Sequence, residues 1–517
     1  MLQPENPALF PFNTSLILPA LLIAMLVTAC SSEPKDQTTP LYIRSLATVL
    51  GLTGDPTTGR TLPAITDPKA QLGMKLFFSK ALSGDKDTAC ASCHHPALAG
   101  GDALSLPIGV GAVDPDVVGP GRVHGITVAG GPNDGGPTVP RNAPTTFNVG
   151  LFDQVLFLDG RVESITRIRG VNGDDGFDGS TILTPDSVDR LTADPNAAND
   201  NLPMAQARFE VTSDIGMQGF GAFAGLDHDG VRSHLEQRIG DYGDLVGDLS
   251  PNGWLAAFQA GFESTETDPA VLITFDHIVE AIGEYERSQI FVYTPWKAFM
   301  EGDDNAISLA ARRGALVFML TKAHGGAGCV SCHRGDFFTD ERFYVLGMPQ
   351  IGRGEGDADT GTDDFGRFRV TAVDTDKYAF RTPPLLNVTE TGPWGHDGAF
   401  TTLEAAIRYH LNPQAAFDSY DVNQLEASIV SSGQTTDTQT NTQNALDTLA
   451  SNRARGIASI QTVDLTDQQV ADLLEFMSTL ADPCITDRAC LDSWIPTTGT
   501  GPDGLQLNAK DGQGNPL

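Results

Sequence analysis

The chain has 517 residues, of which 40% are hydrophobic and 19% are charged. This length suggests more than one domain, and this composition supports a packed core and excludes global disorder. Lys and Arg total 33 against 66 Asp and Glu, a formal net charge of -33, which excludes a protein that seeks nucleic acid phosphates. Such a charge can attract a basic protein partner; the alternative is a solvated acidic surface or bound calcium.

The N-terminus has the pattern of an export signal. Residues 16–29 form an apolar run that is too short to span a bilayer comfortably but suits the h-region of a signal. Small residues then precede Cys30, which resembles a bacterial lipoprotein cleavage box, although no Lys or Arg precedes the run. We therefore expect residues 1–30 to be a lipoprotein-type signal and 31–64 to be a linker. The mature chain would lie in the periplasm, lipid-anchored to a bacterial membrane.

Two C-x-x-C-H segments are signatures of covalent haem attachment. The two thiols add to the haem vinyl groups, and the adjacent His becomes the proximal ligand of the iron. Zinc sites and thioredoxin-like redox motifs also use C-x-x-C, but neither explains a His directly after each second Cys. The sequence therefore predicts two covalently bound haem c groups, at Cys90, Cys93 and His94 and at Cys329, Cys332 and His333.

Two further cysteines, Cys484 and Cys490, lie near the C-terminus. In an oxidising compartment they can form a disulfide that closes a small loop. Two free thiols are the alternative.

The periodicity predicts a mainly α protein with long loops, because strand-like alternation is scarce while Gly (55) and Pro (32) are plentiful. Asp67 and Pro68 can start a helix that leads to the first haem motif. Apolar side chains in residues 275–285 follow helical spacing. Thr466 and Gln469 form a capping box that begins a late helix.

The wide separation of the two haem motifs predicts one haem per domain. We place the N-terminal domain at residues 65–292 and the C-terminal domain at 293–492, followed by a disordered tail at 493–517. Residues 165–203 are rich in Asp, Gly and Asn, and residues 414–460 contain a Ser/Thr/Gln tract, so both read as insertions.

Several segments resemble the bacterial diheme cytochrome c peroxidases and the related MauG-type diheme enzymes. The resemblance covers most of residues 65–482 and implies two cytochrome-c-like helical domains, one c-type haem in each, with a calcium ion between them. The matching segments are residues 72–78, Leu82-Ser83-Gly84, CASCH, Arg141 to Thr145 with Asn148, Phe157 to Arg161, Gln206-Ala207, Met217, CVSCHRG, Phe380 to Val388 and Thr391 to Gly398.

The resemblance assigns different tasks to the two haems. The N-terminal haem of the family meets peroxide, with His94 as its proximal ligand here, and the C-terminal haem, on His333, admits electrons. His410 stands where the family places an axial Met, or a Tyr in MauG-type enzymes. His410 also continues a helical stripe, and we expect it to be the distal ligand of the second haem; the stripe comprises Leu403, Ala406, Ile407 and His410.

Further residues carry over from the family. The calcium ligands would be the side chain of Asn142 and the backbone oxygens of Thr391 and Pro393, because calcium prefers hard oxygen donors. In resting peroxidases a His from the loop after the first haem can cap the reactive iron. His124 is the candidate for that position, and a surface histidine is the alternative.

Two departures from the family concern the reaction itself. Leu158 stands where the family has a Trp between the haems, and Gly216 stands where it has a distal Glu that shuttles a proton during O–O cleavage. Gln206 and Asp214 are our candidate catalytic residues in its place, and Glu210 could also substitute if the loop folds inward.

We therefore expect an oxidoreductase that reduces hydrogen peroxide to water with electrons from a small periplasmic donor, such as a cytochrome c or a cupredoxin. One alternative is MauG-like, peroxide-driven oxidation of a protein or organic substrate. The other is a non-catalytic diheme electron carrier. The resemblance allows a homodimer, and we expect contact with a membrane through the lipid anchor alone.

Overall fold

The computed structural model describes residues 37–127, 130–165, 182–457 and 460–517. Helices predominate in this part of the chain, and its strands are two or three residues long, which confirms a mainly α fold. No helix in the described ranges is both long and apolar enough to cross a membrane. The predicted signal at residues 1–30 lies outside the described residues.

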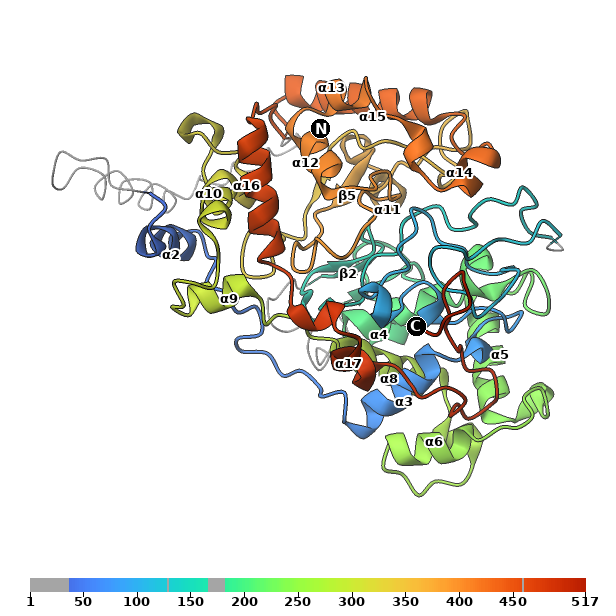
Figure 1. Ribbon diagram of the computed structural model, residues 1–517. Helices are drawn as coiled ribbons and strands as arrows, with labels where there is room; N and C mark the ends of the chain where they lie inside the picture. The colour runs from blue at the N-terminus through green and yellow to red at the C-terminus, as the bar shows by residue number, and fades with distance from the viewer. Residues whose placement is uncertain (1–36, 128–129, 166–181, 458–459) are drawn as a thin grey trace, which may run out of the picture.

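The N-terminal half is organised around α3 and α8, which cross at a glycine (Figure 1). A Cβ on Gly73 would lie 1.8 Å from the carbonyl oxygen of Ala281, so the absence of a side chain lets the two backbones touch. The helix predicted over residues 275–285 is confirmed, and its apolar stripe is buried. The helices of this half are α3 (Pro68–Phe77), α4 (Leu202–Glu210), α5 (His228–Gly240), α6 (Trp254–Gly261), α7 (Pro269–Leu272) and α8 (Phe275–Arg287).

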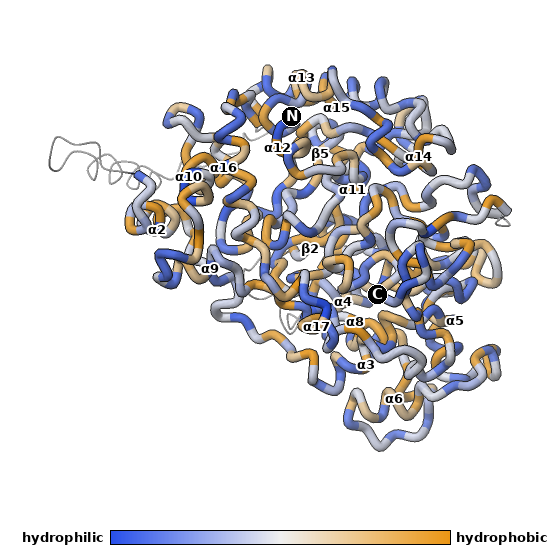
Figure 2. Tube along the Cα trace, viewed as in Figure 1, coloured by the Kyte–Doolittle hydropathy of each residue, from blue (hydrophilic) through white to orange (hydrophobic). Residues whose placement is uncertain are grey.

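The C-terminal half repeats this crossing with α10 and α16. A Cβ on Gly314 would lie 1.8 Å from the carbonyl oxygen of Asp472, and α16 begins at the predicted capping box. Hydrophobic residues recur along these crossing helices (Figure 2). The helices of this half are α9 (Pro295–Met300), α10 (Leu309–Met319), α11 (Phe368–Thr371), α12 (Leu403–Leu411), α13 (Pro413–Phe417), α14 (Ala427–Ser431), α15 (Thr438–Ala454), α16 (Asp467–Ser478) and α17 (Arg488–Leu491).

Short antiparallel strands lie where the two halves meet. The backbone N–H of Arg381 donates to the carbonyl of Leu158 at 2.9 Å, which ties the second small sheet to the loop after β1. Leu156 pairs with Val162, and Tyr344 pairs with Phe380. The strands are β1 (Val155–Leu156), β2 (Val162–Ser164) and β3 (Ile182–Leu183) in one sheet, and β4 (Phe343–Val345) and β5 (Ala379–Arg381) in the other.

The described part of the expected linker is folded onto the C-terminal half. Residues 40–49 form α2 (Pro40–Val49), which packs against α10. Ile43 and Ala47 are buried in the same core as α10, and Arg44 pairs with Asp304 at 2.6 Å. A buried apolar face therefore replaces the linker that the polar sequence suggested.

The predicted insertion at 414–460 is also integrated into the fold. Its helices α13, α14 and α15 cover the C-terminal half, at the top of Figure 1. Ala445 and Leu449 of α15 are buried against Val345 and Tyr378, so α15 supports the small sheet next to the second haem motif.

The structure contradicts the expectation of a disordered tail at residues 493–517. This segment returns to the N-terminal half, where Leu507 is 1% exposed and its N–H donates to the carbonyl of Phe78 at 2.7 Å. The buried carboxylate of Asp503 accepts hydrogen bonds from Trp254 Nε1 at 2.9 Å and Ser79 Oγ at 2.8 Å. Polar composition misled the prediction, because this order comes from pairing with a distant partner.

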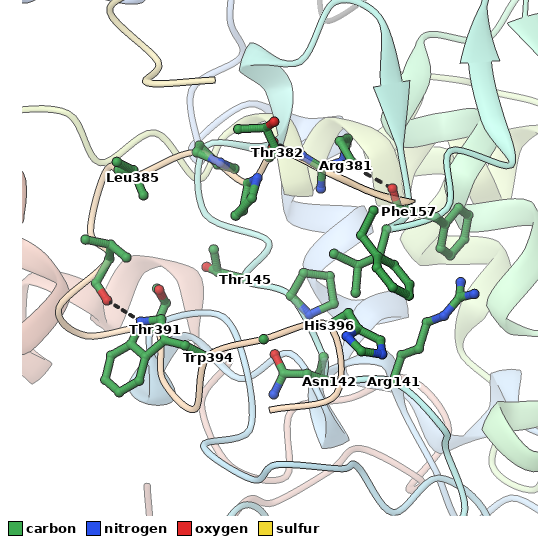
Figure 3. Close-up of a pocket in the computed structure, with 18 of the residues that line it drawn as sticks. Arg141, Asn142, Thr145, Phe157, Arg381, Thr382, Leu385, Thr391, Trp394 and His396 are labelled. Carbon is green, nitrogen blue, oxygen red and sulfur yellow. Dashed lines mark hydrogen bonds between the residues drawn. The ribbon is translucent and has the colours of Figure 1, made fainter. Parts of the chain in front are cut away.

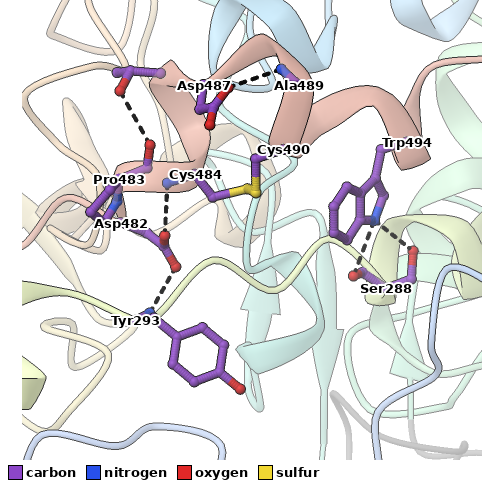
Figure 4. The surroundings of a disulfide bond; sticks show 10 residues. Ser288, Tyr293, Asp482, Pro483, Cys484, Asp487, Ala489, Cys490 and Trp494 are labelled. Carbon is purple, nitrogen blue, oxygen red and sulfur yellow. Dashed lines mark hydrogen bonds between the residues drawn. A yellow bond between two sulfur atoms is a disulfide. The ribbon is translucent and has the colours of Figure 1, made fainter.

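Cys484 and Cys490 form the predicted disulfide, with Cα atoms 5.4 Å apart (Figure 4). Asp482, just before this loop, accepts from the N–H of Tyr293 at 2.7 Å. Just after it, Trp494 Nε1 donates to the backbone and side-chain oxygens of Ser288, both at 3.2 Å. The disulfide loop thus joins the connection between the two halves to the start of the tail.

We expect Asp503→Ala to destabilise the protein by about 1–3 kcal/mol, because two buried donors lose their acceptor. Denaturant unfolding of the full chain would measure this loss. Asp511→Ala is the matched control, since the Asp511 carboxylate accepts from Gln513 and Asn515 within its own turn. An equal loss of stability in both variants would contradict the role of Asp503 in holding the tail against the N-terminal half.

Candidate functional site

A cavity of about 910 Å³ extends between the two halves and reaches both C-x-x-C-H motifs. Its wall is largely apolar and includes Phe77, Val211 and Ile282 near the first motif. The same wall contains all six residues of the two motifs. The sequence placed one haem motif in each half, and the structure brings both motifs to one continuous space.

The four motif cysteines are free thiols in the part of the chain that the structure describes. Burial raises the pKa of each of them, to about 12 for Cys329, so the thiols are uncharged at neutral pH. Within the described residues no three His, Cys, Asp or Glu side chains converge to hold a metal ion. Paired cysteine thiols in an apolar cavity fit thioether attachment of haem.

Three histidines in the cavity wall share one hydrogen-bond pattern. The Nδ1 atom of His94 lies 3.3 Å from the carbonyl oxygen of Gly100. The Nδ1 atom of His333 lies 3.1 Å from the carbonyl oxygen of Phe338, and the Nδ1 atom of His410 lies 2.7 Å from the carbonyl oxygen of Ala406. An N–H at Nδ1 donating to a carbonyl leaves Nε2 with a lone pair, as an iron ligand requires. Burial lowers the pKa of all three rings, which are therefore neutral at neutral pH.

The second motif faces a second imidazole. Burial and, next, the nearby His410 lower the pKa of His333 to about 4, so the two rings lie within electrostatic range of each other. Leu403, Ala406 and Ile407, the other members of the predicted stripe on α12, line the cavity together with His410. The residues present therefore fit a haem held between two imidazoles.

The part of the cavity wall that α4 and the following turn form carries polar side chains. Gln206 and Glu210 line the cavity, whereas Asp214 lies outside the wall as the described residues define it, and its carboxylate accepts from the N–H of Ile215 at 2.8 Å. Asp214 begins the turn that contains Gly216 and Met217, which do line the cavity. This placement contradicts Asp214 as a group that faces the first haem motif and retains Gln206.

His124 is likewise placed away from the cavity. It is 2% exposed, and neither ring nitrogen has a hydrogen-bond partner among the described residues. The tail holds the loop that carries it, because the N–H of Val118 donates to Lys510 and the N–H of Lys510 donates to Asp116, at 3.0 and 2.9 Å. His124 therefore does not line the cavity as the described residues define it, and its role as a cap on the first iron stays a prediction.

Residues between the two motifs form a third part of the wall (Figure 3). Leu158 lines the cavity, so an apolar side chain stands where the family has Trp. Trp394 also lines it and donates from Nε1 to the carbonyl of Val388 at 2.9 Å. The His396 ring stacks on Phe380 with centroids 4.0 Å apart. An aromatic wall thus lies between the motifs, but on residues other than the one the family uses.

The three expected calcium ligands, Asn142, Thr391 and Pro393, all line this cavity. The Asn142 amide nitrogen donates to the carbonyls of Leu104 and Ser105, at 2.9 and 3.2 Å. This bonding commits the nitrogen and turns the amide oxygen away from those carbonyls, as a cation ligand requires.

Comparisons with known proteins agree with this geometry. Residues 67–305 match the family model of di-haem cytochrome c peroxidases. The chain is 25% identical to the methylamine utilization protein MauG of Methylorubrum extorquens over 67% of this chain and 69% of that protein. It is 24% identical to the cytochrome c551 peroxidase of Pseudomonas aeruginosa over 73% of this chain and 80% of that protein.

A solved structure shares the fold. A MauG-like protein associated with microbial copper homeostasis superposes with a TM-score of 0.51 at 19% identity, covering 84% of this chain and 97% of that one. Family model, relatives and fold agree with the two haem motifs. The family model, which covers residues 67–305, and the curated relatives agree that this chain is similar to di-haem cytochrome c peroxidases and MauG proteins, peroxidase-type oxidoreductases that carry two haem c groups.

Proposed function

We propose that the protein reduces hydrogen peroxide to water with electrons from a small periplasmic donor, a cytochrome c or a cupredoxin. The observation that carries this proposal is the asymmetry of the cavity. The second motif faces His410, whereas the wall near the first motif offers Gln206 and Glu210. Iron between two imidazoles is saturated and suits electron transfer, and iron with a free position can bind peroxide.

The chain's own residues would divide the work accordingly. Cys90 and Cys93 would attach the first haem and His94 would hold it, while Cys329 and Cys332 would attach the second haem, which His333 and His410 would hold. Bound haem supplies the one-electron chemistry that no side chain can perform. Gln206 offers an amide that can hydrogen-bond and orient peroxide in the first part of the cavity.

The second candidate function is MauG-like oxidation of a protein or organic substrate at a distance. Leu158 and Gly216 favour it, because the residues that the peroxidase reaction uses at these positions are missing, whereas His410 in place of the axial Tyr of MauG-type enzymes counts against it. Donor oxidation distinguishes the two functions: a MauG-like enzyme would respond to peroxide without sustained turnover of a small cytochrome.

Calcium, export and anchoring complete the proposal. Calcium would bind Asn142 Oδ1 and the backbone oxygens of Thr391 and Pro393, and would fix the wall between the motifs. The chain would be exported to the periplasm and anchored by a lipid on Cys30, so the acidic surface would face a soluble donor.

We expect the purified, half-reduced protein with calcium to oxidise reduced cytochrome c when peroxide is added, and His94→Gly to abolish this turnover. His324→Gly is the matched control, because His324 is exposed and lies outside the haem ligands. Wild-type protein that lacks turnover while its haem spectrum still responds to peroxide would refute the peroxidase proposal and support the MauG-like function.

We expect His410→Met to raise the midpoint potential of the second haem, since a thioether ligand favours ferrous iron relative to imidazole. Spectroelectrochemical titration would measure the two potentials separately. His324→Met should change neither potential. An unchanged potential in His410→Met would show that His410 is not an iron ligand.

A further inference from the structure

We propose that Glu210 is the proton-transferring residue of the first haem pocket and that Gly216 creates the space for its carboxylate. This inference rests on the proposed reduction of peroxide and names the residue that performs its acid–base step. The feature that points to it is a close approach between these two residues.

Gly216 and Glu210 compete for one position in the cavity wall. A Cβ on Gly216 would lie 2.3 Å from Glu210 Oε1, which is much shorter than any real contact between a carbon and an oxygen. Both residues line the cavity. The carboxylate of Glu210 therefore occupies the space that a side chain at position 216 would need. It reaches the cavity wall from α4, whereas the carboxylate of Asp214 in the turn does not line the cavity as the described residues define it.

The carboxylate is next to the first haem motif and available for reaction. Its negative charge contributes to raising the pKa of both Cys90 and Cys93, which places it near both attachment points. The described residues provide it with no hydrogen-bond donor. Charged carboxylates in folded chains are normally paired, so an unpaired one in a cavity wall is free to exchange a proton with a small molecule.

Neighbouring charges have opposing effects on the pKa of Glu210, which would allow its carboxyl both to accept and to donate a proton. Burial raises the pKa of its carboxyl, the guanidinium of Arg161 opposes this rise, and Glu355 adds to it. Arg161 lines the same cavity, lies over the ring of Phe157 at 3.7 Å, and pairs with Asp159 at 3.2 Å. A general acid–base group works best when its pKa is moved from its usual range toward the working pH.

In the proposed reaction, H2O2, two electrons and two protons give two water molecules. Glu210 accepts a proton from one peroxide oxygen and delivers it to the other. The O–O bond breaks, and the second oxygen leaves with the bonding pair as water. Two electrons from the donor protein and two protons from solvent would reduce the remaining oxygen atom to the second water, with bound haem supplying the electron-transfer chemistry.

We expect Glu210→Gln to lower peroxide turnover about 100-fold or more, the range in which general acid–base groups act. A second readout is independent of turnover: hydrogen cyanide must lose its proton to bind ferric haem, so its binding rate to the oxidised protein should fall at least tenfold. Glu263→Gln is the matched control, because Glu263 is an exposed carboxylate of the same half, and it should leave both rates unchanged.

A double variant tests the shared space directly. Glu210→Ala combined with Gly216→Glu places a carboxylate in the volume vacated by Glu210, and should recover at least tenfold in both rates over Glu210→Ala. Unchanged cyanide binding and turnover in Glu210→Gln would overturn the inference while leaving the peroxidase proposal intact. Slow cyanide binding in Glu210→Gln, in a protein whose wild type has no turnover, would support Glu210 and refute the peroxidase reaction.

Discussion

Arg141 is buried where the two halves meet, and its guanidinium pairs with Asp159 at 2.6 Å and Asp364 at 2.7 Å. Against the effect of burial, Arg141 lowers the pKa of Asp159 and of Asp364, so both carboxylates stay charged. Removing one partner from such a buried group typically costs about 3–5 kcal/mol, because the other charges are left unpaired. Arg367 extends the network to Glu163. One cavity can reach both haem motifs only while these charges hold the halves in register.

The same cavity depends on two glycines that are not part of its wall. Gly73 and Gly314 let α3 meet α8 and α10 meet α16 at backbone contact, and each first helix leads into a haem motif. Tyr285 and Phe476 occupy matching places in the two crossings. The two halves therefore present their motifs in the same way, and their functional difference must come from what lies opposite: an imidazole on α12, or a carboxylate on α4.

Sequence alone predicted the features that local pattern determines. The C-x-x-C-H motifs, the stripe of residues 275–285, the box at Thr466 and the pairing of Cys484 with Cys490 each depend on neighbours in the chain. The tail and α2 were misjudged, and the burial of His124 was not predicted, because their environment comes from residues hundreds of positions away. Position 216 is a similar case. The sequence shows that Gly216 lacks the carboxylate of the family, and the structure adds that the carboxylate of Glu210 occupies the space beside it.

Protonation keeps several buried carboxyls of this acidic chain uncharged. Burial raises the pKa of Glu286 and Asp397 to about 8 and that of Asp102 to about 7, so these carboxyls hold protons that the unfolded chain releases at lower pH. At these three groups the folded state binds more protons between the unfolded and folded pKa values, so the stability that they contribute falls as pH rises through about 4 to 8. Glu286 lines the cavity in this neutral form. Glu210, whose rise Arg161 opposes, is the carboxyl best placed to carry a charge there, which concentrates proton exchange at the first haem motif.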